Sequence, residues 1–472
     1  MSRQVTMGLL FYPRGGSAQV VRYLARGLER SGWTTRLACG SLGEPGERTH
    51  AQSFFAGMEV SGADYRAALQ AASAGKDPIA EPVPMHPSYE DRADAVDRIF
   101  TAVTPELGEH LVSAWEPLIE AAGSAPSADV LHLHHLTPIH EAAARVLADV
   151  PVVTHLHGTE LKMIDRAERL RGEGGENWRY AEHWLAQMRK WAARSDRLIV
   201  ISPHDQEEVG RLLGLDPSTA TWIPNGVDLE RFDRVELTTD ERMTRWRRWL
   251  VDEPQGWREG ADAGSVAYAE ADLERFVDDE TGEAAPVLLF VGRFTEVKRI
   301  PLLLRAYARA KASFVRRAPL VIWGGFPGEW EGEHPHTVAE REGIEDAFFL
   351  GWRGHSELGE GLACSDVMVM PSINESFGQV FVEAMACAVP VIAANAGGPP
   401  SFINVDPDRP NGWLVEPDSL ESLAAAMVEA VNNPATRAER AANGYEVTRR
   451  DYSWDTLAER TADVYDEAIA AR

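Results

Sequence analysis

The chain alternates between short apolar runs and longer segments in which apolar residues recur at helical spacing. The runs are rich in Val, Ile and Leu and are nearly continuous, which is typical of parallel strands buried on both faces. Six lie in the first half, at 5–12, 34–39, 130–134, 152–156, 197–201 and 220–223, and six in the second, at 287–291, 320–323, 347–350, 367–370, 389–393 and 413–415. This pattern predicts an α/β protein with two doubly wound parallel sheets.

Polar stretches between these runs predict the domain boundaries. Residues 235–285 are charged and poor in strand-like runs, and Ser453 is a suitable N-cap for a final helix. The expected segments are a Rossmann-like domain at 1–234 with an insertion at about 41–89, a linker with an insertion at 235–285, a second Rossmann-like domain at 286–452 and a helix at 453–472.

The predicted linker contains three tryptophans, Trp246, Trp249 and Trp257, beside a cluster of arginines at 245–248. We expect the tryptophans to pack locally in a solvated helical excursion. A lid or a partner surface is the alternative interpretation of the same cluster.

Composition narrows the class of protein and its partners. Of 472 residues, 44% are hydrophobic and 25% charged, as in water-soluble globular proteins, and no apolar run is long enough to span a membrane. The formal net charge of −26 disfavours nucleic acid and anionic membrane surfaces as partners. The apolar run near the N-terminus is too short for a signal peptide, so we expect a cytoplasmic protein. Cys39, Cys364 and Cys387 are far apart, which predicts core positions rather than disulfides or a zinc site.

The segment 366–398 carries the strongest indication of a ligand. The buried run at 367–370 is followed by Glu375-Ser376-Phe377-Gly378 and then by a helical stretch that contains Glu383. Ligands bind beyond the carboxyl ends of parallel strands, where a helix start offers unpaired N–H groups to an anion. Carboxylates accept hydrogen bonds from sugar hydroxyls, so the two glutamates suit a diphosphate with a sugar on each side. Two ordinary surface glutamates are the alternative.

Two cations follow the first strand of the second half. Arg293 comes directly after the run at 287–291, and Lys298 lies five residues later. A departing diphosphate gains negative charge that fixed cations stabilise, and arginine offers phosphate a bidentate fork. Surface cations near a helix start are disfavoured unless an anion meets them. Together with the glutamates, these residues predict a diphosphate site.

In the first half, candidate ligand positions follow two strands. Gly15 and Gly16 come after the first strand and allow backbone to approach a ligand closely, although a plain tight turn also explains them. His157 follows the run at 152–156, where an imidazole could bond a sugar hydroxyl.

Two patterns raise the question of a metal. His157 belongs to a group of six histidines within 26 residues, the others being His132, His134, His135, His140 and His155. No carboxylate or cysteine pattern completes a familiar ligand set there. Asp406-Pro407-Asp408 matches a D-x-D metal pattern but lies in a Pro-rich loop, which favours a turn. We therefore expect no metal.

Together, these motifs resemble the retaining nucleotide-sugar glycosyltransferases of family 4, which have the GT-B architecture. The matching pieces are PRGG at 13–16, THLHG at 154–158, VIS at 200–202, IPNGVD at 223–228, FVGRFTEVK at 290–298, PSINESFGQVFVEAMACAVPVIAANAGG at 371–398 and NGWLVEP at 411–417. Two positions depart from the family pattern. Arg299 replaces the glycine that often follows the lysine at the position of Lys298. The acidic residue that usually comes shortly after the second Gly-Gly is absent after Gly397-Gly398.

The resemblance implies two domains that face a cleft, with a final helix that crosses back to the first domain. Arg293 and Lys298 would bind the donor diphosphate, Glu383 the ribose and Glu375 the transferred sugar. The expected catalytic residues are Arg293, Lys298, Glu375 and, in the acceptor-side domain, His157. The other expected donor-binding residues are Gly15, Gly16, Ser376, Phe377 and Gly378.

The implied function is transfer of a sugar, with retention, from a UDP-linked donor to a hydroxyl or other nucleophile. The acceptor would be a small metabolite, a sugar phosphate, a natural product or a glycan, and no metal or other cofactor is expected. A homodimer is compatible with the sequence, whereas membrane association and nucleic-acid binding are not expected. Two alternatives stay open: a nucleotide-sugar epimerase on the same fold, and a non-catalytic nucleotide-sugar-binding protein.

Overall fold

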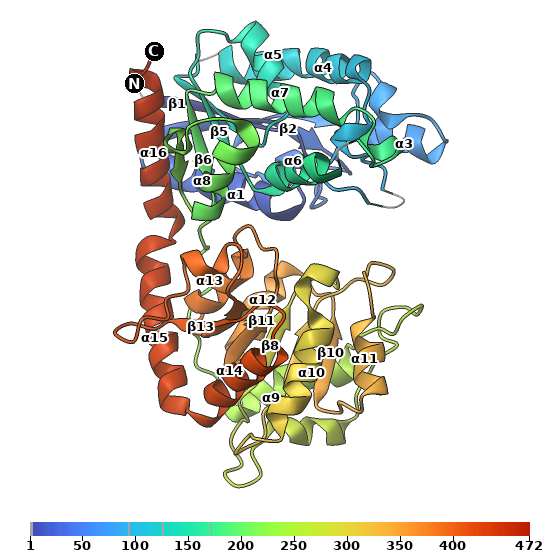
Figure 1. Cartoon of the computed structure of the whole chain (residues 1–472), viewed down its shortest axis with the longest axis vertical. Coiled ribbons are helices and arrows are strands. Elements are labelled where there is room, and N and C mark those ends of the chain that lie inside the picture. Colours follow the sequence, from blue (N-terminus) through green and yellow to red (C-terminus); the bar gives the residue numbers. More distant parts are fainter. Residues whose placement is uncertain (1–2, 93–94, 125–126, 171) are drawn as a thin grey trace. The chain divides into compact units, whose positions relative to one another are not determined.

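The apolar runs form two separate parallel sheets flanked by helices (Figure 1). A computed structural model describes residues 3–92, 95–124, 127–170 and 172–472. The chain divides into unit 1, Met1–Gly226 with Trp454–Arg472, and unit 2, Val227–Ser453. The ladders between the named strands are parallel, and most strand positions are buried because helices cover both faces. The predicted α/β class with two doubly wound parallel sheets is confirmed.

Unit 1 contains a seven-stranded sheet in the order β3-β2-β1-β4-β5-β6-β7. Its strands are β1 (Arg3–Leu9), β2 (Trp33–Ser41), β3 (Glu59–Asp64), β4 (Val130–His134), β5 (Val152–His155), β6 (Arg197–Val200) and β7 (Ala220–Trp222). The chain leaves β1 toward one edge and returns to β4 on its other side. The loop after β1 therefore lies at the switch point where such sheets bind ligands.

The prediction of six strands in the first half was wrong by one. β3 lies inside the segment 41–89 that was predicted to be an insertion, and it pairs with β2 at the edge of the sheet. Its sequence, EVSGAD, has only two apolar side chains, and most of its residues are at least partly exposed. An edge strand of this kind carries no continuous apolar run, so the pattern missed it.

The helices of unit 1 include one from the end of the chain. They are α1 (Gly15–Arg30), α2 (Ala51–Phe54), α3 (Arg66–Ser73), α4 (Pro105–Ser124), α5 (Ile139–Val146), α6 (Thr159–Leu170), α7 (Ala181–Arg194), α8 (Pro203–Glu208) and α16 (Trp454–Ala470). Helix α16 packs beside α1 (Figure 1). Gly27 makes this approach possible, because a Cβ there would lie 2.6 Å from the carbonyl oxygen of Trp454.

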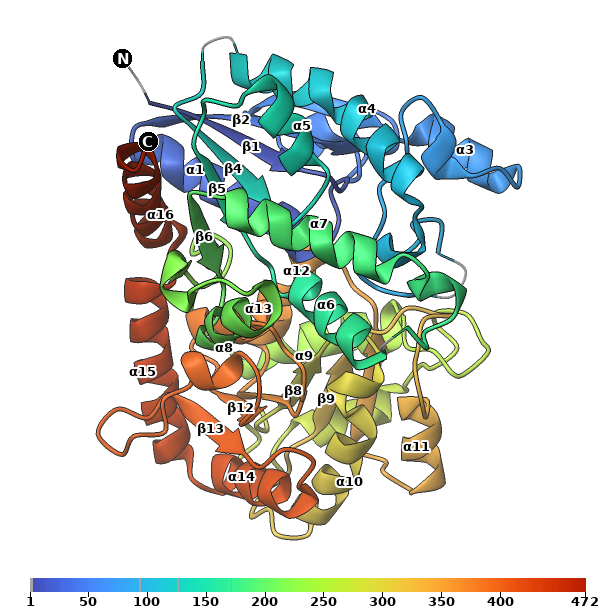
Figure 2. The same ribbon diagram turned by 45° about the horizontal axis from the view of Figure 1, so that its top comes forward.

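Unit 2 contains a six-stranded sheet in the order β10-β9-β8-β11-β12-β13. Its strands are β8 (Leu288–Val291), β9 (Leu320–Trp323), β10 (Ala347–Gly351), β11 (Val367–Met370), β12 (Val391–Ala394) and β13 (Gly412–Val415). Its helices are α9 (Thr239–Arg247), α10 (Ile300–Lys311), α11 (Pro335–Arg341), α12 (His355–Ala363), α13 (Gln379–Ala386), α14 (Leu420–Asn432) and α15 (Pro434–Asp451). Helices α10 and α14 pack against each other (Figure 2). The switch point lies between β8 and β11.

Residues 235–285 are part of unit 2. Trp246, Trp249 and Trp257 are at most 1% exposed. Trp246 packs on Phe276, and Trp249 packs on Trp323 at the end of β9. The prediction of a solvated excursion with locally packed tryptophans was therefore wrong in part: the side chains are buried, but Trp249 packs against a strand of the unit 2 sheet, so the segment belongs to the core of that unit.

The three cysteines lie in the core, as the sequence predicts. Cys39, Cys364 and Cys387 are free and buried, and burial raises the pKa of Cys364 and of Cys387 to about 12. None of the helices in the described ranges combines the length and apolar character that a membrane crossing requires.

Candidate active site

The loops that follow β8 and β11 meet at the carboxyl edge of the unit 2 sheet. These strands are neighbours, and the backbone N–H of Ile373 donates to the carbonyl of Val297 at 3.0 Å. Lys298 and Glu375 form an ion pair between the same two loops, with side chains 18% and 16% exposed. The structure thus brings together two residues that the sequence placed in one diphosphate site.

Arg293 lies exposed just beyond β8. Within the described residues it has no ion-pair partner, whereas Lys298 has Glu375. The loop therefore presents one compensated and one uncompensated cation. An anion that binds at this edge of the sheet can contact both cations, Arg293 and Lys298.

Arg299 explains one departure from the family pattern. Its φ is 54°, in the left-handed region that glycine adopts without cost and that costs other residues roughly 1–2 kcal/mol. Its Nε donates to Asp418 at 2.7 Å, and its Nη1 donates to the carbonyl of Glu296 at 3.0 Å. Arg299 thus adopts the left-handed conformation that a glycine would adopt after Lys298, and its hydrogen bonds to Asp418 and Glu296 help to hold it there.

The loop that carries Glu375 depends on two glycines after β12. The N–H of Gly398 donates to the carbonyl of Glu375 at 2.8 Å. A Cβ at Gly397 would lie 2.3 Å from that oxygen, and one at Gly398 would lie 2.5 Å from the carbonyl oxygen of Ser376. Only glycine permits this close approach, so the Gly397-Gly398 pair shapes the loop that carries Glu375.

Helix α13 begins directly after this loop. Gly378 is its N-cap with a φ of 91°, and Phe377 is buried against Phe402 with ring centroids 5.2 Å apart. The buried ring fixes the backbone before the helix, whose first N–H groups have no acceptor within the helix. Such a helix start favours an anion.

Glu383 lies just over one turn into α13 and is 5% exposed. Its Oε1 lies 2.9 Å from Nε2 of His355, the first residue of α12. Nη1 of Arg231 lies 3.1 Å from Nδ1 of the same histidine. Neither His355 nor Arg231 was predicted as a site residue, because neither belongs to a recognisable sequence motif.

Gly15 and Gly16 begin α1 in unit 1. Gly15 has a φ of 68°, and a Cβ at either glycine would meet nothing within 4 Å. Both positions therefore face open space. The preceding Arg14 is held by an ion pair with the buried Asp97 and by a 2.9 Å hydrogen bond to Tyr12 Oη.

His157 is buried in unit 1, beyond β5. Its backbone N–H donates to Oε1 of Glu160 at 3.0 Å, and its Nε2 lies 3.0 Å from Nδ1 of His134. Burial alone would raise the pKa of Glu160, but His135 and the N–H groups at the start of α6 hold that pKa below its usual range. The ionised Glu160 thus fixes the loop of His157. Glu160 lies in the first turn of a helix, three residues after His157. A glutamate at such a position is a sequence signal for a residue that holds the start of the helix.

Four of the histidines form two edge-to-edge pairs. Nε2 of His132 lies 3.3 Å from Nδ1 of His155, and the pair of His134 and His157 stacks against them. Burial lowers the pKa of His155 to about 3 and the pKa of His132, His134 and His157 well below the usual value. All four are therefore neutral at pH 7.

Among the residues that the structure describes, His132, His134 and His155 form a group that could hold a metal, with nitrogens within 4.8 Å of one another. The rings of His132 and His134 are stacked 4.4 Å apart at only 12°. Lone pairs lie in the ring planes, so those of two stacked parallel rings do not converge on one ion. This arrangement fits hydrogen-bonded imidazoles better than metal ligands. Asp406 accepts a 3.1 Å bond from the N–H of Asp408, as in a turn.

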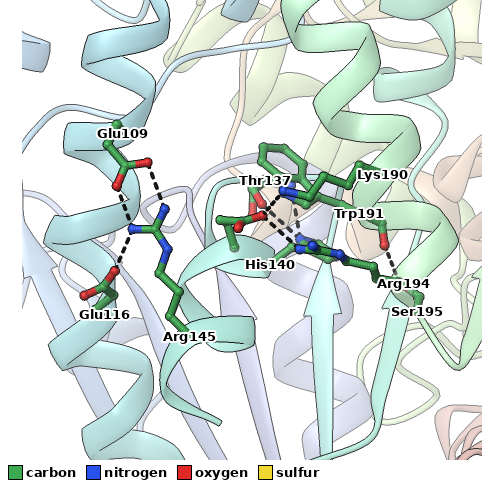
Figure 3. Close-up of polar contacts among 10 residues, drawn as sticks. Glu109, Glu116, Thr137, His140, Arg145, Lys190, Trp191, Arg194 and Ser195 are labelled. Atoms are coloured by element: carbon green, nitrogen blue, oxygen red, sulfur yellow. Dashed lines mark hydrogen bonds and ion pairs between the residues drawn. The ribbon is translucent and has the colours of Figure 1, made fainter. Parts of the chain in front are cut away.

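His140 belongs to a separate polar network between α5 and α7 (Figure 3). Its Nδ1 lies 3.0 Å from the carbonyl oxygen of Thr137, and its Nε2 lies 2.9 Å from Oγ1 of Thr154. Nearby, Arg194 donates to Glu141 at 3.1 Å. Both nitrogens of His140 have protein partners, which indicates a structural role.

Comparison with known proteins decides the family. The model of glycosyl transferases group 1 matches residues 274–447, and that of glycosyltransferase family 4 matches residues 14–231. A D-inositol 3-phosphate glycosyltransferase of Catenulispora acidiphila is 31% identical over 328 residues, which are 64% of this chain and 74% of the relative. The chain belongs to the family 4, group 1 glycosyltransferases.

Solved structures share the fold of this glycosyltransferase. A sucrose-phosphate synthase from Thermosynechococcus elongatus aligns over 100% of both chains, with a TM-score of 0.63 and 19% identity. The Anabaena protein HepE in complex with UDP-glucose aligns over 98% of this chain and 99% of its own, with a TM-score of 0.60 and 18% identity. The GT-B architecture is thereby confirmed.

Both matched regions of the glycosyltransferase contain predicted site residues. The group 1 match includes Arg293, Lys298, Glu375 and Glu383. The family 4 match includes Gly15, Gly16 and His157. The roles assigned to these residues stay predictions.

Proposed function

We propose that this glycosyltransferase moves a sugar from a UDP-linked donor to a hydroxyl of a small phosphorylated acceptor, with retention of anomeric configuration. The observation that carries the proposal is the Lys298–Glu375 ion pair between the loops after β8 and β11. The pair supports the proposal because it brings a cation, which a diphosphate needs, beside a carboxylate, which can accept hydrogen bonds from a sugar.

The ion pair sets up an exchange of partners. A donor diphosphate is a stronger partner for Lys298 than one carboxylate is, because it presents more charge and more acceptor oxygens. When Lys298 turns to the diphosphate, the Glu375 carboxylate is free to accept hydrogen bonds from sugar hydroxyls. Donor binding thus replaces one partly buried ion pair by two polar contacts.

The positions of the fixed positive charges then explain how sugar transfer proceeds. The bond between the anomeric carbon and the diphosphate oxygen breaks, and the negative charge on the leaving group grows toward Lys298, Arg293 and the start of α13. The acceptor oxygen bonds to the anomeric carbon from the face that the diphosphate leaves, and its proton passes to a diphosphate oxygen. Fixed cations stabilise this transition state more than the ground state. No enzymic nucleophile is needed.

We also propose that the reaction needs no divalent metal. Two cations and a helix start supply positive charge at the predicted diphosphate position, while Asp406 and Asp408 form a turn. The matched relatives support the choice of substrates: one solved structure contains UDP-glucose, and two relatives are named for an inositol 3-phosphate and a sucrose-phosphate activity.

The test is incubation of the purified protein with UDP-, GDP- and ADP-glucose and a panel of sugar and inositol phosphates, with and without EDTA. Mass spectrometry detects the product, and the NMR coupling constant of its anomeric proton reports the configuration. An α-linked product from an α-linked donor, formed equally well with EDTA, is expected. An inverted product contradicts retention, and loss of turnover in EDTA contradicts the metal-free reaction. Conversion of the donor without acceptor favours an epimerase, and binding without turnover favours a sensor.

A further inference from the structure

We infer that His355 and Arg231 are positioning residues for the donor ribose, acting through Glu383. The inference rests on the proposed function, which places the ribose on Glu383. It assigns a role to a histidine that no recognised motif contains.

The hydrogen-bond chemistry fixes the state of His355. A guanidinium has donors and no acceptor, so Nδ1 of His355 must accept the hydrogen bond from Arg231. In a neutral imidazole the proton then lies on Nε2, which donates to Oε1 of Glu383 at 2.9 Å. Arg231 thereby selects the one tautomer that can hold the glutamate.

The hydrogen bond from His355 determines which oxygen of Glu383 is available to a ligand. The residue is 5% exposed, and its carboxylate has two oxygens. His355 occupies Oε1, which leaves Oε2 to accept a hydrogen bond from a ribose hydroxyl. With one oxygen held, the carboxylate cannot rotate freely, so less conformational entropy is lost when the ribose binds.

The backbone around Arg231 is itself fixed against α12. Phe232 is 1% exposed and packs edge-on to the His355 ring, with centroids 5.3 Å apart. A Cβ at Gly359 would lie 3.2 Å from the carbonyl oxygen of Arg231, so the glycine permits close packing of the segment on the helix. The chain that follows the IPNGVD motif therefore orients a side chain beside the predicted nucleotide site.

The experiment measures binding of UDP and of dUDP, which lacks the ribose 2′-hydroxyl, by titration calorimetry. Loss of a positioned hydrogen bond predicts that His355→Ala weakens UDP binding about tenfold. The same change should weaken dUDP binding less than threefold, because dUDP lacks the 2′-hydroxyl, which we assign to Oε2 of Glu383. His355→Gln, whose amide can donate to Glu383 and accept from Arg231, should restore UDP binding to within about threefold.

His204→Ala is the matched control, since this histidine is exposed on α8 of unit 1. If His355→Ala fails to fold, Arg231→Met tests the same contact, and it too should weaken UDP more than dUDP. An equal loss for both nucleotides, or no loss, overturns the inference. A wild-type protein that binds none of UDP, GDP and ADP overturns the proposed function instead, and if GDP or ADP is the ligand, its 2′-deoxy form replaces dUDP.

Discussion

Lys298 and Glu375 pair with each other although 77 positions separate them in the sequence. They meet because β8 and β11 are neighbours at the switch point of the unit 2 sheet. The opposite charges compensate each other in the free protein, so each residue becomes available only when a ligand competes for its partner. Variants of the two residues should therefore have different effects on binding.

Lys298→Ala should lower kcat by roughly two orders of magnitude, because the departing diphosphate loses a fixed cation. Steady-state rates measure the effect, with the nucleotide sugar that the donor screen proposed above finds to be active. Lys311→Ala is the matched control, since this lysine of unit 2 is half exposed at the end of α10. Near-normal turnover of the Lys298 variant would remove this residue from the mechanism.

Glu375→Gln should separate binding from turnover. The amide no longer neutralises Lys298, so the affinity for free UDP should stay the same or rise a few fold. Turnover should fall about a hundredfold, because the sugar loses its charged hydrogen-bond acceptor. Calorimetry with UDP and initial rates with UDP-sugar distinguish the two effects. A variant that loses UDP affinity as strongly as turnover contradicts the exchange of partners.

Gly398→Ala should disturb the loop of Glu375 without touching a ligand. The new Cβ would lie 2.5 Å from the carbonyl oxygen of Ser376, which forces the backbone to shift. We expect a loss of about 1–3 kcal/mol in the free energy of unfolding and at least a tenfold loss of turnover. Gly62→Ala in β3 is the control, since its nearest neighbour would be 3.5 Å away. Equal behaviour of the two variants would show that the loop tolerates the shift.

The stacked histidines should make stability depend on pH. Burial lowers the pKa of His155 from 6.5 to about 3, so below pH 6.5 the unfolded chain binds a proton that the folded chain does not. Stability should be full above pH 6.5 and fall as the pH drops below it, by about 1.4 kcal/mol per pH unit for each such histidine. Urea unfolding followed by tryptophan fluorescence between pH 7.5 and 4.5 measures this slope. His155→Gln should flatten it by one proton, and an unchanged slope would contradict the assignment.

The parallel strands of both sheets were predictable, because residues buried on both faces leave continuous apolar runs. The exception is β3, whose edge position tolerates polar and small residues in place of a continuous apolar run. The site of Lys298 and Glu375 was predictable once the strands were known, because the carboxyl ends of neighbouring parallel strands share one edge of the sheet.

His355 was not predictable. It lies 28 positions from Glu383 and 124 from Arg231, and its contacts follow from the tertiary packing that brings these three side chains together. No local pattern encodes that packing. The interleaved histidine pairs were not predictable for a similar reason, because the register between β4 and β5 decides which nitrogens meet.

Helix α16 imposes an order on how the protein is made. It contributes the buried Leu457, Val464 and Tyr465 to unit 1, and Tyr465 contacts His132 of β4. These residues are translated only after the whole of unit 2. The first part of unit 1 therefore emerges from the ribosome before the helix that covers it has been made, and the core of unit 1 can be completed only after unit 2 has been translated.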